Sequence, residues 1–201
     1  MSKLFCIMGK SASGKDTIFK RLVQDEILCL KTIVSYTTRP MREGEKDGEE
    51  YHFVSREKLE DLRKQGKVIE CRDYATVHGI WSYFMVDDGQ IDFSGKRDSV
   101  IIGTLESYVQ IRDFFGAEHV MPIYIDVEDG LRLSRALERE RKQAQPKYAE
   151  LCRRFLADTA DFSPEKRKAC GIHQIYENID IEICLNRIRT DIVKMRENVL
   201  Y

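Results

Sequence analysis

The sequence predicts an α/β fold in which a mainly parallel sheet is flanked by helices on both faces. Two observations support this prediction. Short apolar runs, of the kind that is buried on both faces of a sheet, alternate with longer stretches of helical periodicity. A glycine-containing loop follows the first apolar run directly and precedes a helical stretch. Such an alternation with short loops gives a parallel sheet that binds its ligands at the carboxyl ends of the strands.

The expected elements follow in chain order. Strands are expected over residues 4–8, 32–35, 68–71, 99–102, 120–125 and 175–177. Helices are expected over residues 15–24, 56–65, 105–115, 129–142, 148–162 and 181–196. Ser55 is a suitable N-cap for the second of these helices, and Gly66 is a suitable residue just past its end.

Two segments interrupt the alternation. Residues 36–95 contain many polar and β-prone residues between turn glycines, which favours an insert with antiparallel pairing. Residues 135–165 are dense in arginine and acidic residues, which favours a solvated helical flap. We therefore expect one domain over residues 1–201, with a core of residues 1–35, 96–134 and 166–201, an acceptor-binding β-rich insert at about 36–95 and a helical lid at about 135–165.

Composition narrows the range of partners. The 33 lysines and arginines nearly cancel the 34 aspartates and glutamates, so no overall field favours nucleic acid or an anionic membrane. The six cysteines are scattered without a C-x-x-C pair, and no apolar stretch is long enough to span a bilayer. We expect a cytoplasmic protein, monomeric or homodimeric, that binds neither nucleic acid nor membrane.

The loop after the first strand has the pattern of a phosphate-binding P-loop. Its residues are Gly9, Lys10, Ser11, Ala12, Ser13, Gly14, Lys15, Asp16 and Thr17. Small residues allow successive backbone N–H groups to face phosphate oxygens, and the N-terminus of the following helix adds partial positive charge. Lys15 is expected to reach between the β- and γ-phosphates of a bound triphosphate such as ATP. The expected sheet is therefore of the P-loop NTPase type.

The residue after the loop lysine is unusual. Asp16 occupies the place where a serine or threonine usually offers its hydroxyl to Mg²⁺. Its carboxylate could hold the ion directly or through water, because hard cations favour carboxylate oxygen. Thr17 could instead approach the ion through water or contact the α-phosphate. Asp16 and Thr17 are thus both candidate ligands for the Mg²⁺ that accompanies ATP.

A second motif lies early in the expected insert, where residues 35–45 read SYTTRPMREGE and residues 48–53 read GEEYHF. Two guanidinium groups three residues apart in a proline-marked loop can clamp one phosphate, and a tyrosine hydroxyl adds a neutral donor. This stretch resembles the GMP-binding segment of guanylate kinases. The resemblance implies that Arg39, Arg42 and Tyr51 hold the GMP phosphate, with Ser35 near the guanine and Glu45 in the same site.

The resemblance covers nearly the whole chain and implies further site residues. Glu70 matches the carboxylate that binds guanine in this family, since guanine offers two adjacent N–H donors where adenine offers an acceptor. Tyr83 matches a second tyrosine of the family with a shift of one residue, and Thr104 lies where the family has an aspartate. These three residues complete the expected GMP site.

The expected lid also matches the family. Arg135 and Arg139 are spaced to share one helix face, and Arg154 lies in a segment that is similar to the family's I-x-x-R-L. Together with Lys15 and Arg42, these arginines are expected to stabilise the transferring phosphoryl group and exclude water. Asn178 matches an asparagine near the base of the donor nucleotide. The resemblance therefore implies transfer of the γ-phosphoryl group from Mg-ATP to GMP or dGMP.

Three departures from the family pattern leave alternatives open. The segment from Val77 to Phe84 replaces the family's G-N-Y-Y-G-[ST], the segment from Ile102 to Ser107 replaces its D-I-D-x-Q-G, and Asp16 follows the loop lysine. The last two resemble ribose 1,5-bisphosphate phosphokinases, which share the fold. The segment from Ile102 to Ser107 lacks the two aspartates of D-I-D-x-Q-G. Their loss is also compatible with a non-catalytic guanylate-kinase-like binding module.

Overall fold

The structure is a computed structural model that describes residues 1–76, 79–95 and 97–197. Its strands are β1 (Leu4–Met8), β2 (Lys31–Thr32), β3 (Tyr36–Thr37), β4 (His52–Phe53), β5 (Val68–Thr76), β6 (Gly79–Val86), β7 (Ser99–Ile102), β8 (Val120–Asp126) and β9 (Tyr176–Glu177). Its helices are α1 (Lys15–Val23), α2 (Arg56–Lys64), α3 (Leu105–Phe115), α4 (Asp129–Arg141), α5 (Tyr148–Asp161), α6 (Pro164–Ala169) and α7 (Ile181–Glu197).

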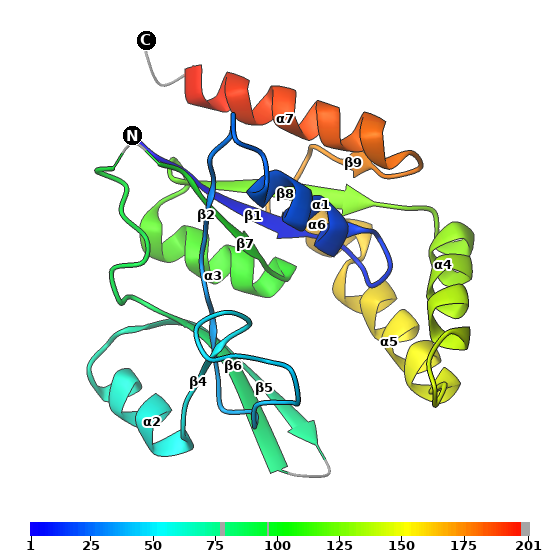
Figure 1. The fold of residues 1–201 in the computed structure, drawn as a ribbon. Helices are drawn as coiled ribbons and strands as arrows, with labels where there is room; N and C mark the ends of the chain where they lie inside the picture. The colour runs from blue at the N-terminus through cyan, green and yellow to red at the C-terminus, as the bar shows by residue number, and fades with distance from the viewer. Residues whose placement is uncertain (77–78, 96, 198–201) are drawn as a thin grey trace.

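Within these residues the strands form two sheets (Figure 1). The larger sheet is parallel throughout and has the order β2-β7-β1-β8-β9. Helices α1 and α7 cover one face of it and α3 covers the other (Figure 1). The fold is thus a P-loop-type α/β sheet flanked by helices, as the sequence predicts.

The central strand β1 shows why the sheet is covered on both faces. All five of its residues are buried, and alternate side chains point to opposite faces. Phe5 and Ile7 pack with α1 and α7, whereas Leu4, Cys6 and Met8 pack with α3. An uninterrupted apolar run is therefore the expected sequence of this strand.

The smaller sheet has the order β4-β3-β6-β5. Strand β6 pairs antiparallel with both β3 and β5, which agrees with the pairing expected for this segment. Leu59 and Leu62 of α2 pack against Phe84 and Val86 of β6. Ile69 of β5 and Met85 of β6 belong instead to the same cluster as α3. Helix α3 therefore contributes to the cores of both sheets.

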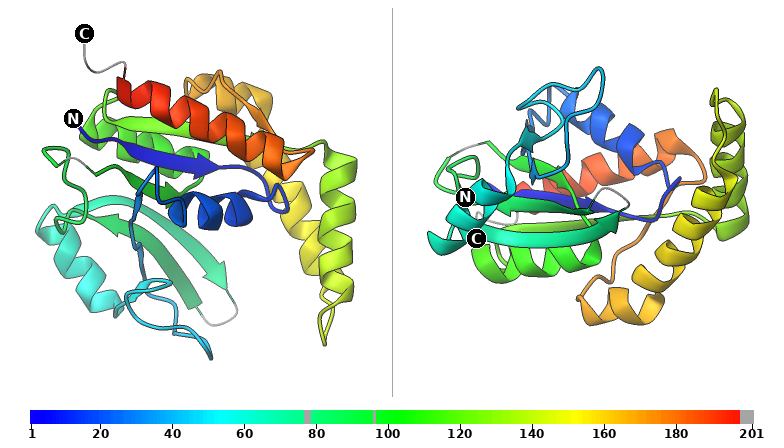
Figure 2. Two further views of the ribbon diagram at one scale, coloured as in Figure 1. Left: turned by 45° about the horizontal axis from the view of Figure 1, so that its top comes forward. Right: turned by 90° about the horizontal axis from the view of Figure 1, so that it is seen from below.

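Helices α4 and α5 lie side by side at one end of the large sheet and project beyond it (Figures 1 and 2). The buried carboxylate of Glu140 accepts a hydrogen bond of 2.5 Å from the backbone N–H of Lys147 and so joins the end of α4 to the start of α5. None of the helices in the described residues combines the length and apolar character that a membrane crossing requires. All six cysteines are free thiols.

Most expected elements are present, with shifts at their ends. The strand expected over residues 32–35 is wrong in extent, because the chain pairs with β7 at Lys31–Thr32 and then crosses to the other sheet as β3. Helix α6 was not expected; it starts with Ser163 as N-cap and Pro164 at its first turn. Strand β5 extends five residues past the expected end at 71, since it forms a long hairpin with β6.

Candidate functional site

The phosphate loop connects β1 to α1 and requires glycine at both of its ends. A Cβ atom on Gly9 would lie 2.4 Å from the carbonyl oxygen of Ile125, and one on Gly14 would lie 2.3 Å from Nδ2 of Asn178. Both glycines also have positive φ angles, +154° and +86°. Asn178 Nδ2 donates a hydrogen bond of 2.7 Å to the carbonyl oxygen of Ser13. Asn178, the residue that follows β9, therefore holds the loop in place through this hydrogen bond.

Asn178 is 2 % exposed in this position. Its own backbone N–H donates to the carbonyl oxygen of Asp126, at the end of β8, over 2.8 Å. The structure therefore places Asn178 as a support for the loop, whereas the resemblance implied a residue near the base of the donor nucleotide.

A cleft of about 710 Å³ lies in front of the phosphate loop. It is lined by the loop, the smaller sheet, the N-terminus of α3 and helix α5. The expected site residues in its lining are Gly9, Ser11, Lys15, Asp16, Ser35, Tyr51, Tyr83, Thr104 and Arg154. The carboxyl ends of β1 and β7 supply the phosphate loop and Thr104, and the smaller sheet with its adjoining loops supplies the acceptor residues of the same cleft.

The two arginines of the acceptor motif have different environments. Arg39 is 3 % exposed, and its Nη1 and Nη2 donate to the two carboxylate oxygens of Glu45 over 2.8 Å each. The hydrogen bonds from Arg39, with one from the backbone N–H of Arg42, lower the pKa of Glu45 to about 2. The guanidinium of Arg39 also lies 5.5 Å from the Tyr51 ring centre. Arg42 is exposed.

Glu70 is 2 % exposed and already has a partner. Arg72, two residues further along β5, donates from Nε and Nη2 to the Glu70 carboxylate over 3.0 and 3.3 Å. Burial raises the pKa of Glu70, against the opposing effect of Arg72. Arg72 lines the cleft, and Glu70 lies behind it. The group that meets a ligand first at this position is therefore a guanidinium.

Thr104 lies in the cleft as the N-cap of α3. Its Oγ1 accepts from the backbone N–H of Ser107, and the Ser107 hydroxyl accepts from the backbone N–H of Thr104. Tyr83 contacts Tyr51 and Tyr74 edge to face, with ring centres 5.6 Å apart in both pairs. Val77 and His78, which precede this part of the expected site, lie outside the described residues.

The three expected lid arginines are not together. Arg154 lines the cleft and lies 3.8 Å from the carboxylate of Glu150. Arg135 donates from Nη2 to the carbonyl oxygens of Asn178 and Ile179 over 3.0 and 3.3 Å. Arg139 is exposed on α4. Only Arg154 of these arginines faces the cleft in this conformation.

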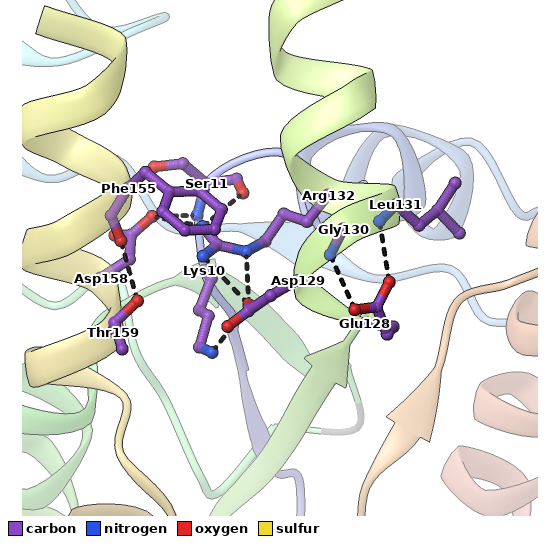
Figure 3. A network of polar contacts seen from close by, with 10 residues as sticks. All are labelled: Lys10, Ser11, Glu128, Asp129, Gly130, Leu131, Arg132, Phe155, Asp158 and Thr159. Carbon is purple, nitrogen blue, oxygen red and sulfur yellow. Dashed lines mark hydrogen bonds and ion pairs between the residues drawn. The ribbon is translucent and has the colours of Figure 1, made fainter.

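Helix α5 instead reaches the phosphate loop through a carboxylate (Figure 3). Asp158 Oδ2 accepts a hydrogen bond of 2.7 Å from the backbone N–H of Ser11. Arg132 of α4, only 1 % exposed, lies between Asp158 and Asp129, with its nitrogens 3.3 and 3.1 Å from their carboxylates (Figure 3). Its guanidinium stacks over the Phe155 ring at 3.8 Å. These charges hold α4 and α5 against the loop.

Asp129 also binds the loop from the other side. Lys10 Nζ donates to Asp129 Oδ1 over 3.1 Å. Burial opposes ionisation of Asp129, but the hydrogen bonds and charges of Lys10 and Arg132 outweigh it and lower its pKa. Glu128 caps α4 by accepting from the N–H groups of Gly130 and Leu131 over 2.8 and 2.9 Å (Figure 3). The start of α4 is thus fixed beside the loop.

Sequence reasoning did not find Arg72, Arg132 and Asp158. For Arg72 a signal was available, because residues two apart in a strand share a face and Glu70 was already a candidate. For Arg132 and Asp158 no local signal exists. They are 26 residues apart, and each lies in a helix rich in charges that looks solvated in the sequence.

The expected metal ligands differ in position. Asp16 lines the cleft beside Lys15, with its carboxylate 3.6 Å from Lys15 Nζ. Thr17 is exposed and lies outside the lining. The described residues contain no group of three or more acidic, histidine or cysteine side chains arranged to hold a metal ion. Because its carboxylate lines the cleft, Asp16 stays a candidate ligand for a Mg²⁺ ion that arrives with a triphosphate, for which one protein carboxylate is sufficient.

Comparison with known proteins gives matches to guanylate kinases. A model described as guanylate kinase matches residues 1–80. The guanylate kinase of Vibrio vulnificus strain YJ016 is 35 % identical over 107 residues, which cover 47 % of this chain and 50 % of that protein. The guanylate kinase of Neisseria meningitidis serogroup A is 45 % identical over 110 residues, which cover 55 % and 52 % of the two chains. The chain thus spans about half the length of these curated relatives.

A solved structure extends the likeness to the rest of the fold. The crystal structure of guanylate kinase from Anaplasma phagocytophilum matches with a TM-score of 0.61, over 100 % of this chain and 87 % of that one. The two sequences are 22 % identical, so this match concerns the fold alone. The chain is therefore similar to guanylate kinases in sequence over about half of its length and in fold over all of it.

Proposed function

We propose that this protein transfers the γ-phosphoryl group of Mg-ATP to GMP or dGMP, giving ADP and GDP or dGDP. The observation that supports this most is the shared cleft, which is lined by Lys15 of the phosphate loop and by Ser35, Tyr51 and Tyr83 of the acceptor side. A phosphate-loop lysine and the tyrosine of the acceptor motif on one cavity suit a reaction between two phosphates, although Arg39 and Arg42 do not line it in this conformation.

In this proposal the protein mainly positions and neutralises charge. The acceptor phosphate is already anionic, so its oxygen can attack the γ-phosphorus in line without a general base. Lys15 stabilises the charge on the transferring group, and Arg154 is the lid arginine placed to assist it from α5. Arg42 is exposed and would pair with the acceptor phosphate.

Asp16 is the residue that would hold the Mg²⁺ bound with ATP, directly or through water. Bound there, the ion would offset charge on the β- and γ-phosphates. Lys15 and Asp16 lie next to each other at the N-terminus of α1, so cationic and metal-binding groups face the same end of the triphosphate. Arg135 and Arg139 would have to turn from their present positions to contact it.

A second candidate acceptor is a sugar bisphosphate such as ribose 1,5-bisphosphate. The observation in its favour is the pair formed by Glu70 and Arg72. In this pair the carboxylate that would bind guanine is engaged, and a guanidinium faces the cleft. Arg153 and Arg154 line the same cavity and would suit a second phosphate. The intact acceptor motif around Tyr51 favours GMP.

The test is an assay of ADP production from Mg-ATP with GMP, dGMP, AMP, CMP, UMP and ribose 1,5-bisphosphate, each also with Lys15→Ala. We expect turnover with GMP or dGMP that falls by about 100- to 1,000-fold in the variant, since Lys15 acts on charge developed in the transition state. Turnover with the sugar alone would establish the second candidate. No turnover with any acceptor would reject both reactions and favour a binding module.

A further inference from the structure

The contact between α5 and the phosphate loop places an anionic group of the protein at the mouth of the loop. A P-loop offers successive backbone N–H groups to phosphate oxygens. Ser11 belongs to this loop, and its backbone N–H donates to the carboxylate of Asp158 over 2.7 Å. A carboxylate and a phosphate oxygen are both anionic acceptors, so they compete for such a donor.

The surroundings of this carboxylate are suited to an anion in general. Arg132 is 1 % exposed, and its Nη1 lies 3.3 Å from Asp158 Oδ2 and 3.4 Å from the carbonyl oxygen of Ser11. The four charged groups here are Lys10, Arg132, Asp129 and Asp158, which cancel. Without Asp158 the cluster has a net charge of +1. An incoming phosphate oxygen would therefore restore the balance that Asp158 now provides.

Arg132 would remain in place when Asp158 leaves. Asp129 holds it over 3.1 Å, Asp129 is itself held by Lys10, and all of these groups belong to the loop or to α4. Only Asp158 and the stacked Phe155 belong to α5. The contact can therefore open on the α5 side while its cationic half stays fixed beside the loop.

We infer that Asp158 occupies a phosphate site formed by the Ser11 N–H and Arg132, and that a bound triphosphate displaces it. Arg132 then pairs with the phosphate in place of the Asp158 carboxylate. Binding of the donor nucleotide and loss of the hydrogen bond between Asp158 and the Ser11 N–H become one event. This inference rests on the proposed function only in taking the loop to bind a nucleoside triphosphate.

The size of the effect follows from competition. If the docked carboxylate outweighs the released state by about ten to one, the apparent affinity for the triphosphate is about tenfold weaker than that of the free loop. Removal of the carboxylate should recover this factor. Asp158→Ala leaves Arg132 paired with Asp129, so the variant retains a partner for the buried guanidinium.

The experiment is a calorimetric titration of Mg-ATP into the wild type, Asp158→Ala and Glu138→Gln. Glu138 is an exposed acid of α4, so its replacement removes the same charge away from the loop. We expect the dissociation constant to fall about tenfold in Asp158→Ala and to stay within about twofold in Glu138→Gln. The gain should persist in 1 M salt, where the screening length is about 3 Å and general fields are suppressed.

The outcomes separate the two proposals. Equal or weaker binding by Asp158→Ala, or a gain that disappears in high salt, contradicts the displacement while the wild type still binds Mg-ATP. Failure of both the wild type and Asp158→Ala to bind rejects the loop as a nucleotide site and the displacement with it. Binding by Asp158→Ala alone supports the displacement strongly.

Discussion

Glu45 has the carboxylate most strongly affected by its partners in the acceptor motif. Hydrogen bonds from Arg39 lower its pKa from 4.5 to about 2. A carboxylate with a lowered folded-state pKa stabilises the fold above its unfolded pKa, and this contribution is lost as the pH falls through the folded value. The acceptor loop is therefore most stable near neutral pH and loses this support in acid.

We predict that the free energy of unfolding at pH 6 is higher for the wild type than for Glu45→Gln. The two values should become alike as the pH falls from 4.5 to 2. Urea unfolding at intervals over this range measures the difference. Glu49→Gln, in the same loop, is the control, because Glu49 is exposed and binds only Lys46 among the described residues. A constant difference between wild type and Glu45→Gln down to pH 2 would show that the Arg39 pair does not depend on ionisation.

Glu70 offers a second prediction for a single residue. If guanine binds its carboxylate, Glu70→Gln exchanges an acceptor for a donor and leaves one guanine N–H without a partner. The ratio of kcat/KM for GMP to that for AMP should fall about tenfold or more, as expected for one lost buried hydrogen bond. Glu106→Gln removes a nearby exposed carboxylate and is the control. An unchanged ratio in Glu70→Gln would leave Arg72, which covers the carboxylate, as the group that meets the acceptor.

At the scale of elements, the N-terminus of α3 combines a structural cap with a place in the cleft. Thr104 and Ser107 form reciprocal hydrogen bonds there. We predict that Thr104→Ala lowers the free energy of unfolding by about 1 kcal/mol, because one cap is lost, while Thr104→Ser retains it. Urea unfolding measures this difference.

Ser55→Ala is the matched control, since Ser55 caps α2 by accepting from Lys58 outside the cleft. It should have a similar effect on stability and little effect on acceptor turnover. Wild-type stability in Thr104→Ala would mean that the capping bonds contribute nothing measurable to α3.

The elements also show which parts of the fold are visible in the sequence. The strand at 99–102 and the helix at 105–115 are found at their expected bounds, since an apolar run and a capped amphipathic helix are determined locally. The break between β2 and β3 was not predicted, because local apolar character does not reveal where a chain leaves one sheet for another. The hairpin length of β5 and β6 depends likewise on pairing between distant residues.

At the scale of the whole molecule, the sequence predicts the phosphate loop at residues 9–17 and the acceptor motif at residues 35–53. It does not predict how the side chains around them are arranged in space. Glycines and a lysine at fixed spacing have a local meaning, so the loop around Lys15 was identified correctly as a strand-to-helix connection. The positions of Arg135 and Arg139 depend on how α4 packs. That packing is set by the buried charges of Arg132, which a helical pattern rich in arginine does not distinguish from solvated ones. The division into core, insert and lid remains a prediction.

Helix α3 has a consequence for how the molecule unfolds. Its buried side chains Leu105, Tyr108 and Ile111 belong to one apolar cluster with Cys6 of the large sheet and Met85 of the small one. Neither sheet can melt alone without exposing the side of α3 that it covers to water. Their stabilities are therefore coupled, and the acceptor side of the cleft gains thermal resistance from the core of the sheet that carries the phosphate loop.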